Sequence, residues 1–160
     1  MDASKYKRRA WLEVDLDALD RNVRKCRQII GDKCALTAVV KSNAYGLGAE
    51  VIARELVKAG ADVLAVACLS EAKRLRRILP DAEIMILGDT PLDDMSDAAR
   101  LNLICTIWTE RQAVKAAECG LRVHAKLDTG FHRLGFDCRA EKLPEIARIL
   151  GMKGLKLEGV

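Results

Sequence analysis

The residues best suited to chemistry surround a lysine at the end of an apolar run. Residues 38–48 read AVVKSNAYGLG, so Lys41 follows two β-branched valines and precedes a polar turn with two glycines. Side-chain alternation along a strand places Lys41 on the face of Val39, at the rim of an apolar layer. Partial desolvation lowers the pKa of an amine, which makes Lys41 a candidate nucleophile toward an aldehyde.

The turn after Lys41 is also suited to holding an anion. Its backbone N–H groups and the hydroxyl of Tyr45 are possible donors to a phosphate at the start of the next helix. A simpler structure fits the same pattern, because many lysines at strand ends extend to solvent beside an ordinary turn. The pattern alone favours this simpler interpretation.

A second group of polar residues lies further along the chain, where residues 124–136 read HAKLDTGFHRLGF. Alternation puts His124, Lys126 and Asp128 on one strand face. If that face points into a barrel, the lysine must be paired, for example with Asp128, or covalently modified. Arg133 follows in the loop, where its guanidinium could hold a carboxylate or a phenolate oxygen. A solvent-exposed edge strand followed by a polar turn fits the pattern equally well.

Composition excludes several classes of protein. The chain has 160 residues, half of them hydrophobic, and a net charge of +4 with much of the excess in a basic tail, residues 1–9. Only 4% of residues are aromatic, and no basic stripe accompanies them, which argues against a nucleic-acid surface. No apolar run approaches the ~20 residues of a membrane span, and no signal peptide is evident. We therefore expect a cytoplasmic protein without nucleic-acid or membrane partners.

The cysteines and histidines give no metal site. Six cysteines are dispersed without a C-x-x-C pair, and the chain has two histidines. Zinc-ligand spacing is therefore missing, and we predict no metal. Most of the cysteines stand among apolar residues, so we expect buried, reduced thiols.

The elements that must position these residues alternate between strand and helix. After a strand at Ala10–Val14, apolar residues recur at helical spacing from Leu16 to Ile30, with Asp17 as the N-cap and Gly31 as the stop. Further strands are predicted at Ala35–Val40, Val63–Leu69, Glu83–Leu87, Leu103–Trp108, Arg122–Leu127 and Leu155–Val160. Helices are predicted between them at Ala49–Ala59, Ser70–Leu79, Leu92–Ala99, Glu110–Cys119 and Glu141–Leu150.

Helix-end signals support this alternation. Thr109 and Gln112 form a capping box, Ser70 is the expected N-cap of its helix, and Gly60 is an expected stop. Alternating strands and helices imply parallel strands joined by right-handed crossovers. A doubly wound sheet and a (β/α)8 barrel both fit, but no G-x-G-x-x-G follows the first strand.

We therefore predict an α/β fold, an incomplete TIM-type (β/α)8 barrel of about six parallel strands alternating with helices. The first and last barrel strands, Ala35–Val40 and Leu155–Val160, would be uncovered edges that favour self-association.

Both polar segments resemble motifs of one protein family. Ala38–Gly48 resembles the cofactor-lysine motif of alanine racemases, A-x-V-K-A-N-A-Y-G-H-G, with Ser42 and Leu47 in place of the commoner alanine and histidine. Residues 126–135 resemble the family's K-[VIL]-D-T-G-M-x-R-L-G signature, with Phe131 in place of methionine. The matches follow the order and approximate spacing of the family over nearly the whole chain.

The resemblance implies a fold-type III pyridoxal-phosphate enzyme that interconverts L-alanine and D-alanine for peptidoglycan synthesis. Lys41 would hold the cofactor covalently and exchange a proton with the α-carbon of the D-enantiomer. Tyr45 would contact the phosphate, Val39 would pack beneath the ring and Leu87 would line it. Arg133 would contact the phenolic oxygen of the cofactor and the carboxylate of the substrate.

The resemblance also assigns the other polar residues of the second motif. Lys126 matches the lysine that many family members carboxylate, which would turn a buried cation into an anion beside Arg133. Asp128 and Thr129 are expected to shape the turn, and His132 is expected at the surface.

The resemblance places residues 1–160 in the amino-terminal part of a pyridoxal-phosphate-binding barrel. The later barrel strands, the β-domain and the tyrosine base that a homodimer partner donates have no counterpart here, so we expect a truncated product without activity of its own. Alternatives are a serine or broad-specificity racemase of the same fold, a non-catalytic pyridoxal-phosphate homeostasis protein, or a non-enzymatic interaction or decoy product. The run Asn43–Gly46 argues against the homeostasis protein.

Overall fold

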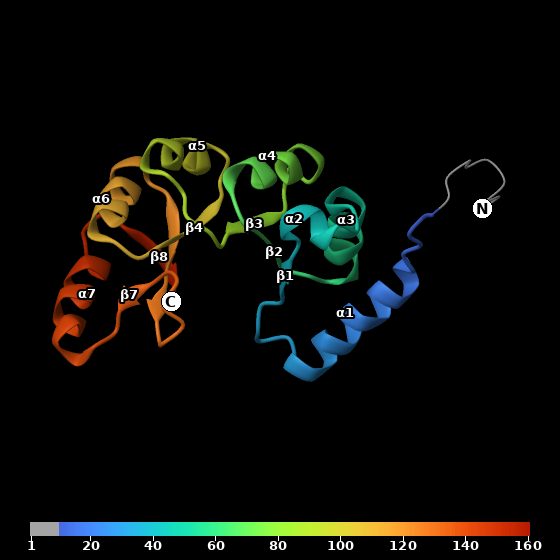
Figure 1. Cartoon of the computed structure of the whole chain (residues 1–160), viewed down its shortest axis with the longest axis horizontal. Coiled ribbons are helices and arrows are strands. Elements are labelled where there is room, and N and C mark those ends of the chain that lie inside the picture. The colour runs from blue at the N-terminus through green and yellow to red at the C-terminus, as the bar shows by residue number, and fades with distance from the viewer. Residues whose placement is uncertain (1–9) are drawn as a thin grey trace.

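The computed structural model describes residues 10–160, and the predicted basic tail lies outside this range (Figure 1). The strands are β1 (Thr37–Val39), β2 (Val63–Val66), β3 (Glu83–Ile86), β4 (Ile104–Ile107), β5 (Arg122–Ala125), β6 (Leu127–Asp128), β7 (Phe136–Asp137) and β8 (Lys156–Gly159). The helices are α1 (Leu16–Ile30), α2 (Lys41–Tyr45), α3 (Ala49–Ala59), α4 (Leu69–Ile78), α5 (Met95–Arg100), α6 (Glu110–Cys119) and α7 (Leu143–Leu150). Two 3-10 turns, η2 (Leu92–Asp94) and η3 (Ala140–Lys142), lead into α5 and α7.

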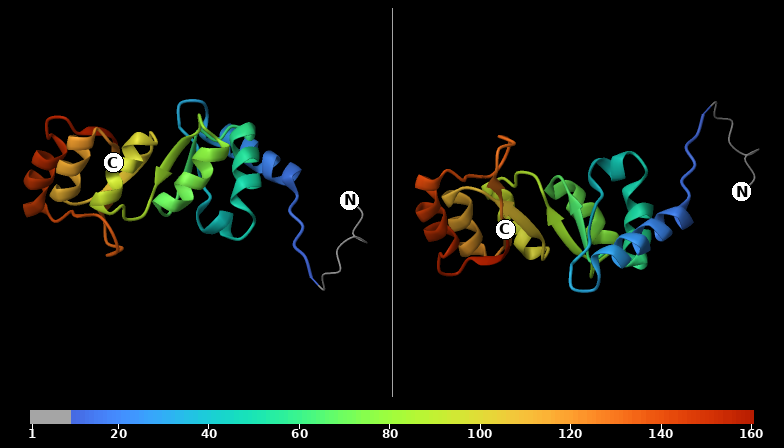
Figure 2. Two further views of the ribbon diagram at one scale, coloured as in Figure 1. Left: turned by 90° about the horizontal axis from the view of Figure 1, so that it is seen from above. Right: turned by 90° about the horizontal axis from the view of Figure 1, so that it is seen from below.

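Six of the strands form one parallel sheet in the order β1-β2-β3-β4-β5-β8. The sheet curves as an arc, and helices α3 to α7 follow one another along its convex side (Figures 1 and 2). A doubly wound sheet would carry helices on both faces, whereas sequential parallel strands with an outer layer of helices make a segment of a barrel. The predicted fold class is confirmed, and β1 and β8 are the two edges of the sheet, as predicted.

The main hydrophobic core lies between the convex face of the sheet and the helices. Alternate residues of the central strands point into this layer and are buried there. They are Leu64, Val66, Ile84, Ile86, Cys105, Ile107, Val123 and Ala125. Burying one Val, Leu or Ile side chain contributes about 1.5–3 kcal/mol, so this layer supplies most of the hydrophobic stabilisation of the sheet.

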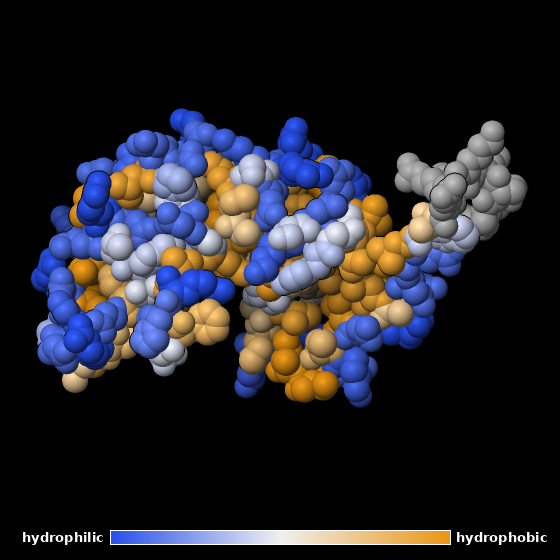
Figure 3. Space-filling model, in the orientation of Figure 1, coloured by the Kyte–Doolittle hydropathy of each residue, from blue (hydrophilic) through white to orange (hydrophobic). Residues whose placement is uncertain are grey.

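The concave face of the sheet carries a smaller apolar row. The strand registers pair Val39 with Ala65, Ala65 with Met85, and Met85 with Ile104, so these side chains share one face. Ala65, Met85 and Ile104 pack together, while Val39 at the edge is 39% exposed. The space-filling view shows this side of the arc as a hollow at the lower edge of the molecule (Figure 3).

An ion cluster crosses the same face near the amino-terminal ends of the strands. The guanidinium of Arg122 donates to both carboxylate oxygens of Glu158, at 2.7 and 3.0 Å, and lies 2.7 Å from a carboxylate oxygen of Glu83. These three side chains come from β5, β8 and β3. We call this group the Arg122 cluster.

The first helix starts earlier than its predicted cap. Asp15, not Asp17, is the N-cap of α1, because its carboxylate accepts the N–H of Ala18 at 2.9 Å. Asp17 instead lies in the first turn, where its charge favours the helix dipole. The predicted stop at Gly31 is confirmed.

Of the other caps and stops named from the sequence, all but one are confirmed. Thr109 and Gln112 form both halves of the capping box at the start of α6, and Gly60 ends α3 in a left-handed conformation. Ser70 is not an N-cap, because α4 begins one residue before it and Cys68 occupies the cap position without a side-chain bond.

Two further expectations are wrong. Ala10–Val14 is not a strand: its backbone pairs with no strand of the described chain, and Trp11 is 64% exposed. The cysteines are mostly not buried, since only Cys105 lies in the core, while Cys26 and Cys34 are exposed. Cys26 is exposed because α1 packs with only one face against the protein. Cys34 is exposed because it lies in the loop after α1.

Residues 10–160 contain no helix long and apolar enough to cross a membrane. Within the same residues, no three histidine, cysteine or acidic side chains gather in a way that could hold a metal ion.

Candidate active site

Lys41 follows β1 at the carboxyl edge of the sheet, where the chain enters a left-handed turn. Ser42, Asn43, Ala44 and Tyr45 all have φ between 53° and 56°. This conformation costs an L-residue about 1–2 kcal/mol, because its Cβ approaches a carbonyl oxygen. Other contacts must therefore hold the turn, and strain of this kind concentrates at functional sites.

Part of that support comes from the turn and the helix after it. The N–H of Ala44 donates to the carbonyl of Val40 at 2.9 Å, and the Ala44 methyl is buried. The side-chain oxygen of Asn43 accepts the N–H of Ala49 at 2.9 Å, which connects the turn to the first residue of α3. The glycine-rich turn leads into a helix, as predicted. Its conformation is left-handed, and the side chain of Asn43 stabilises it.

The Lys41 side chain is half-buried and lies beside Tyr45. Its Nζ is 6.0 Å from the centre of the Tyr45 ring, and Tyr45 is 64% exposed. Val39, two residues before Lys41, extends the apolar row of the concave face at the edge of the sheet. An amine, a phenol and an apolar surface therefore meet at one edge of the sheet.

The next part of the site surrounds the carbonyl oxygen of Leu87, the residue directly after β3. This oxygen accepts Nζ of Lys126 at 2.9 Å and the hydroxyl of Thr106 at 3.2 Å. The Leu87 side chain packs against the apolar row of the concave face. His124 and Lys126 alternate with the buried Val123 and Ala125, as predicted, whereas Asp128 lies in β6, outside the main sheet.

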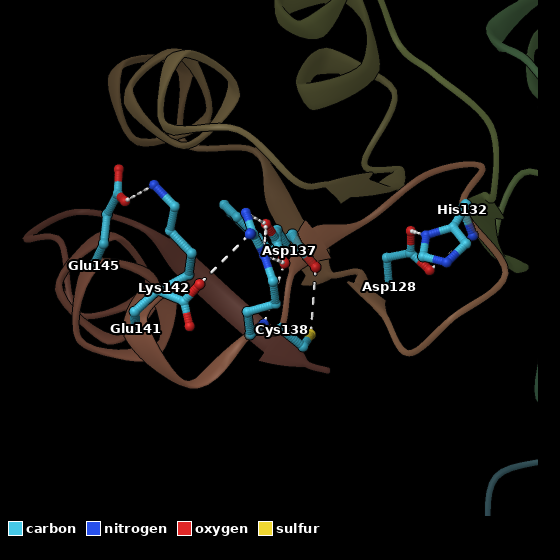
Figure 4. A network of polar contacts seen from close by, with 9 residues as sticks. Asp128, His132, Asp137, Cys138, Glu141, Lys142 and Glu145 are labelled. Atoms are coloured by element: carbon cyan, nitrogen blue, oxygen red, sulfur yellow. Dashed lines mark hydrogen bonds and ion pairs between the residues drawn. The ribbon is translucent and has the colours of Figure 1, made fainter.

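Lys126 does not pair with Asp128. The Asp128 carboxylate instead accepts the N–H groups of Gly130 and His132, both at 3.0 Å, and lies 3.4 Å from the His132 imidazole (Figure 4). Asp128 thus shapes the turn, and His132, with a side chain that is 86% exposed, lies at the surface; both match prediction. The Asp128 carboxylate therefore stabilises its own loop and does not neutralise Lys126.

Burial lowers the pKa of the Lys126 amine, and the positive charge of Arg133 lowers this pKa further. A lysine in this setting releases its proton more readily than one at the surface. Neutral amines are the form that reacts with electrophiles such as carbon dioxide or aldehydes. Besides Lys41, the site therefore contains a second lysine, Lys126, and its surroundings favour the neutral, reactive form of its amine.

Arg133 lies in the exposed loop between β6 and β7. Its guanidinium stacks over the ring of Phe131, 4.8 Å from the ring centre, and Phe131 is itself 79% exposed. The loop closes at Gly135, where an added Cβ would lie 2.4 Å from the backbone nitrogen of Asp128. The positive charge of Arg133 acts on the Lys126 amine, so the structure brings these two side chains near each other.

The candidate site is an open face and not an enclosed cavity. A pocket of about 220 Å³ lies away from Lys41, between β7, α6 and α7, and is lined by Trp108, Phe136 and Ile149 among others. Its lining combines apolar side chains with charged residues that already pair with each other, such as Lys142 and Glu145 (Figure 4). The candidate lysines therefore do not line this pocket.

Two residues at this edge were not identified from the sequence. Thr106 donates to the carbonyl of Leu87, and Glu71 accepts the N–H of Ser42 at 2.7 Å. Thr106 lies in an apolar strand and Glu71 in the first turn of a helix, where both residue types are common. No local signal distinguishes them, because their partners are distant in sequence.

The chain matches one known protein family over most of its length. The description of that family is "Alanine racemase, N-terminal domain", and the match covers residues 14–160. The alanine racemase of Desulforamulus reducens is 40% identical over 156 residues, which are 94% of this chain and 42% of the relative. The alanine racemase of Helicobacter pylori is 35% identical over 160 residues, which are 96% of this chain and 42% of the relative.

Solved structures agree with the sequence relatives. Alanine racemase from Bacillus anthracis with bound L-Ala-P superposes with a TM-score of 0.85 at 35% identity, over 97% of this chain and 42% of that one. Alanine racemase from Clostridium difficile in complex with cycloserine also gives a TM-score of 0.85, at 30% identity, over 97% of this chain and 44% of that one. The chain thus spans about two fifths of the length of the relatives that it matches.

Proposed function

The chain belongs to the alanine racemase N-terminal domain family, and on that premise we propose that it binds pyridoxal phosphate through Lys41 as the cofactor-holding part of an alanine racemase site. The observation that supports this most directly is the left-handed turn. It places one half-buried amine and one phenol together at the carboxyl edge of a barrel sheet, where barrel active sites lie.

The residues present fit this cofactor by their chemistry. Its aldehyde needs an amine, which Lys41 supplies, and its flat ring needs an apolar surface, which Val39 and the side chain of Leu87 supply. Its phosphate needs donors, and we assign the Tyr45 hydroxyl to this role. Arg133 would bind the phenolic oxygen. When bound, the cofactor supplies an electron sink for the charge left at a substrate carbon after proton removal.

The other roles belong to side chains of this chain. Lys41 would move a proton at the α-carbon on one face of the substrate, and Arg133 would hold the substrate carboxylate through directed hydrogen bonds. The neutral amine of Lys126 would combine with carbon dioxide and release one proton, which gives a carbamate anion. This anion would pair with Arg133, whose positive charge now adds to the effect of burial in lowering the pKa of Lys126.

Alanine as substrate and a homodimeric assembly are further parts of the proposal. The relatives that support them are named alanine racemases, and the chain corresponds to about two fifths of their length. Cofactor binding is therefore the activity that we propose for the chain itself. Its lack of racemase activity on its own stays a prediction, which a polarimetric assay with L-alanine would check.

Reductive trapping tests the proposal. The chain is mixed with pyridoxal phosphate, reduced with borohydride, digested and mapped by mass spectrometry. We expect the label to concentrate on Lys41, to disappear from that peptide in Lys41→Ala, and to persist in Lys58→Ala, whose side chain is 75% exposed. Labels distributed over many surface lysines, with no preference for Lys41, would refute cofactor binding at this site.

A further inference from the structure

The Lys41 turn is supported from a neighbouring helix as well as from its own residues. We propose that Glu71 is a positioning residue, which fixes the left-handed turn and thereby sets the direction of the Lys41 amine. The role of Lys41 rests on the proposed function, whereas the support that Glu71 gives to the turn does not.

Glu71 continues the β1–β2 ladder at the point where the two strands separate. The last backbone hydrogen bond between them runs from the N–H of Val40 to the carbonyl of Ala65, at 2.8 Å. One step further, the two strand ends have N–H groups without a backbone acceptor in the ladder. The N–H of Ser42 donates to one oxygen of Glu71 at 2.7 Å, and the N–H of Ala67 donates to the other at 2.8 Å.

The carboxylate thus replaces two missing acceptors. Hydrogen bonds to charged groups are stronger than neutral ones, and the bond to Ala67 is partly buried, where an amide that loses its partner is costly. Ser42 is the first residue of the left-handed turn and directly follows Lys41. Any shift of the Ser42 amide would therefore rotate the backbone that carries the Lys41 side chain.

A simpler role for Glu71 is possible, because it is the third residue of α4. A glutamate at this position often reaches back to an N–H at the start of its own helix, as its bond to Ala67 nearly does. Helix capping alone would not involve Ser42, which lies 29 residues away. The bond to Ser42 is therefore the feature that separates positioning of Lys41 from capping of α4.

Two substitutions distinguish these roles. Glu71→Gln keeps the length of the side chain but has one acceptor oxygen, and its NH2 group would face an N–H donor. Glu71→Asp keeps two acceptors and the charge but is shorter by one methylene, so we expect it to retain Ala67 and release Ser42. Glu50→Gln is the matched control, because Glu50 lies on α3 and makes only an exposed ion pair with Arg74 at 3.6 Å.

The test measures hydrogen exchange at single amides of the whole chain, together with the rate of borohydride trapping of pyridoxal phosphate at Lys41. In Glu71→Gln we expect exchange at Ser42 and Ala67 to rise by about tenfold or more, while the amides of α6 keep their protection. Trapping at Lys41 should fall in both Glu71 variants, because in each of them Ser42 is released. Glu50→Gln should match the wild type in both measurements.

The readouts separate the two proposals. Unchanged exchange at Ser42 in Glu71→Gln would overturn the role of Glu71, and so would Lys41 trapping in Glu71→Asp at the wild-type rate despite a released Ser42 amide. If the wild-type chain showed no preference for Lys41, the proposed function would fail. In that case, exchange at Ser42 would still decide whether Glu71 fixes the turn.

Discussion

Replacing Arg122 with methionine should destabilise the chain by about 2 kcal/mol. Arg122 joins Glu83 of β3 and Glu158 of β8 across the concave face. Methionine preserves the apolar stem of the side chain and removes the charge. The carboxylates of Glu83 and Glu158 would then have no cation between them. The ion pair that joins β8 to β5 would also be lost.

The magnitude follows from the partial burial of the Arg122 cluster. Removing one partner of a well-buried ion pair costs about 3–5 kcal/mol, whereas an exposed pair contributes about 0–1 kcal/mol. The Arg122 side chain is 24% exposed, and its partners Glu83 and Glu158 are 39% and 36% exposed. The stabilisation by the Arg122 cluster should therefore lie between these two limits. It should exceed that of an ordinary surface pair, because the guanidinium donates to both carboxylate oxygens of Glu158.

Urea unfolding followed by circular dichroism measures this loss. The control is Arg148→Met, because Arg148 forms a single ion pair with Glu110 at 2.9 Å and both side chains are about half exposed. We expect the control to lose no more than about 0.5 kcal/mol. If Arg122→Met lost as little as the control, the cluster would not stabilise β8 and the reasoning would be refuted.

The effect should also depend on pH. The hydrogen bonds from Arg122 lower the pKa of Glu158 in the folded chain. A carboxyl with a lowered folded pKa stabilises the fold above its unfolded pKa, about 4.3 for glutamate, and this stabilisation is lost as the pH falls through the folded value. The difference between wild type and Arg122→Met should therefore shrink below about pH 4. A constant difference down to pH 2 would contradict the ionic explanation.

Two further predictions concern titrating groups. Arg133→Gln should raise the pKa of Lys126, because it removes the positive charge that adds to the effect of burial. NMR titration of the 13C-methylated lysines would detect this rise. An unchanged pKa would show that Arg133 does not act on Lys126. Burial raises the pKa of the Cys105 thiol to about 11. At pH 8 it should react with an aromatic disulfide roughly a hundredfold more slowly than the exposed Cys26, and equal rates would contradict the buried position.

Most of the fold could be predicted because its signals are local and repeated. Helices Leu16–Ile30, Ala49–Ala59 and Glu110–Cys119 match their predicted bounds, since each has a clear apolar stripe and a recognisable end. The strands are shorter than predicted, because apolar residues continue past the last paired residue into the turns. Ala10–Val14 has the composition of a strand but no neighbour to pair with, and composition cannot supply a partner.

The candidate site could be predicted only in part, for a different reason. The motif around Lys41 lies in one segment and was identified as a unit. The contacts that shape it come from other segments: Glu71 follows Ser42 by 29 residues, and Leu87 precedes Lys126 by 39. Four consecutive left-handed residues also could not be anticipated, because only one glycine directly follows them and Ser42 and Ala44 rarely adopt this conformation.

The charges at the carboxyl edge indicate what kind of ligand the site favours. Lys41, Lys126 and Arg133 are all basic residues, and no carboxylate within residues 10–160 forms an ion pair with any of them. Asp128 is occupied by the backbone of its own loop, and Leu87 offers Lys126 only a neutral carbonyl. Burial lowers the pKa of Lys126, and repulsion from Arg133 lowers it further. An anionic ligand would relieve this repulsion, and the cofactor that we propose combines negative charge with an aldehyde for the Lys41 amine.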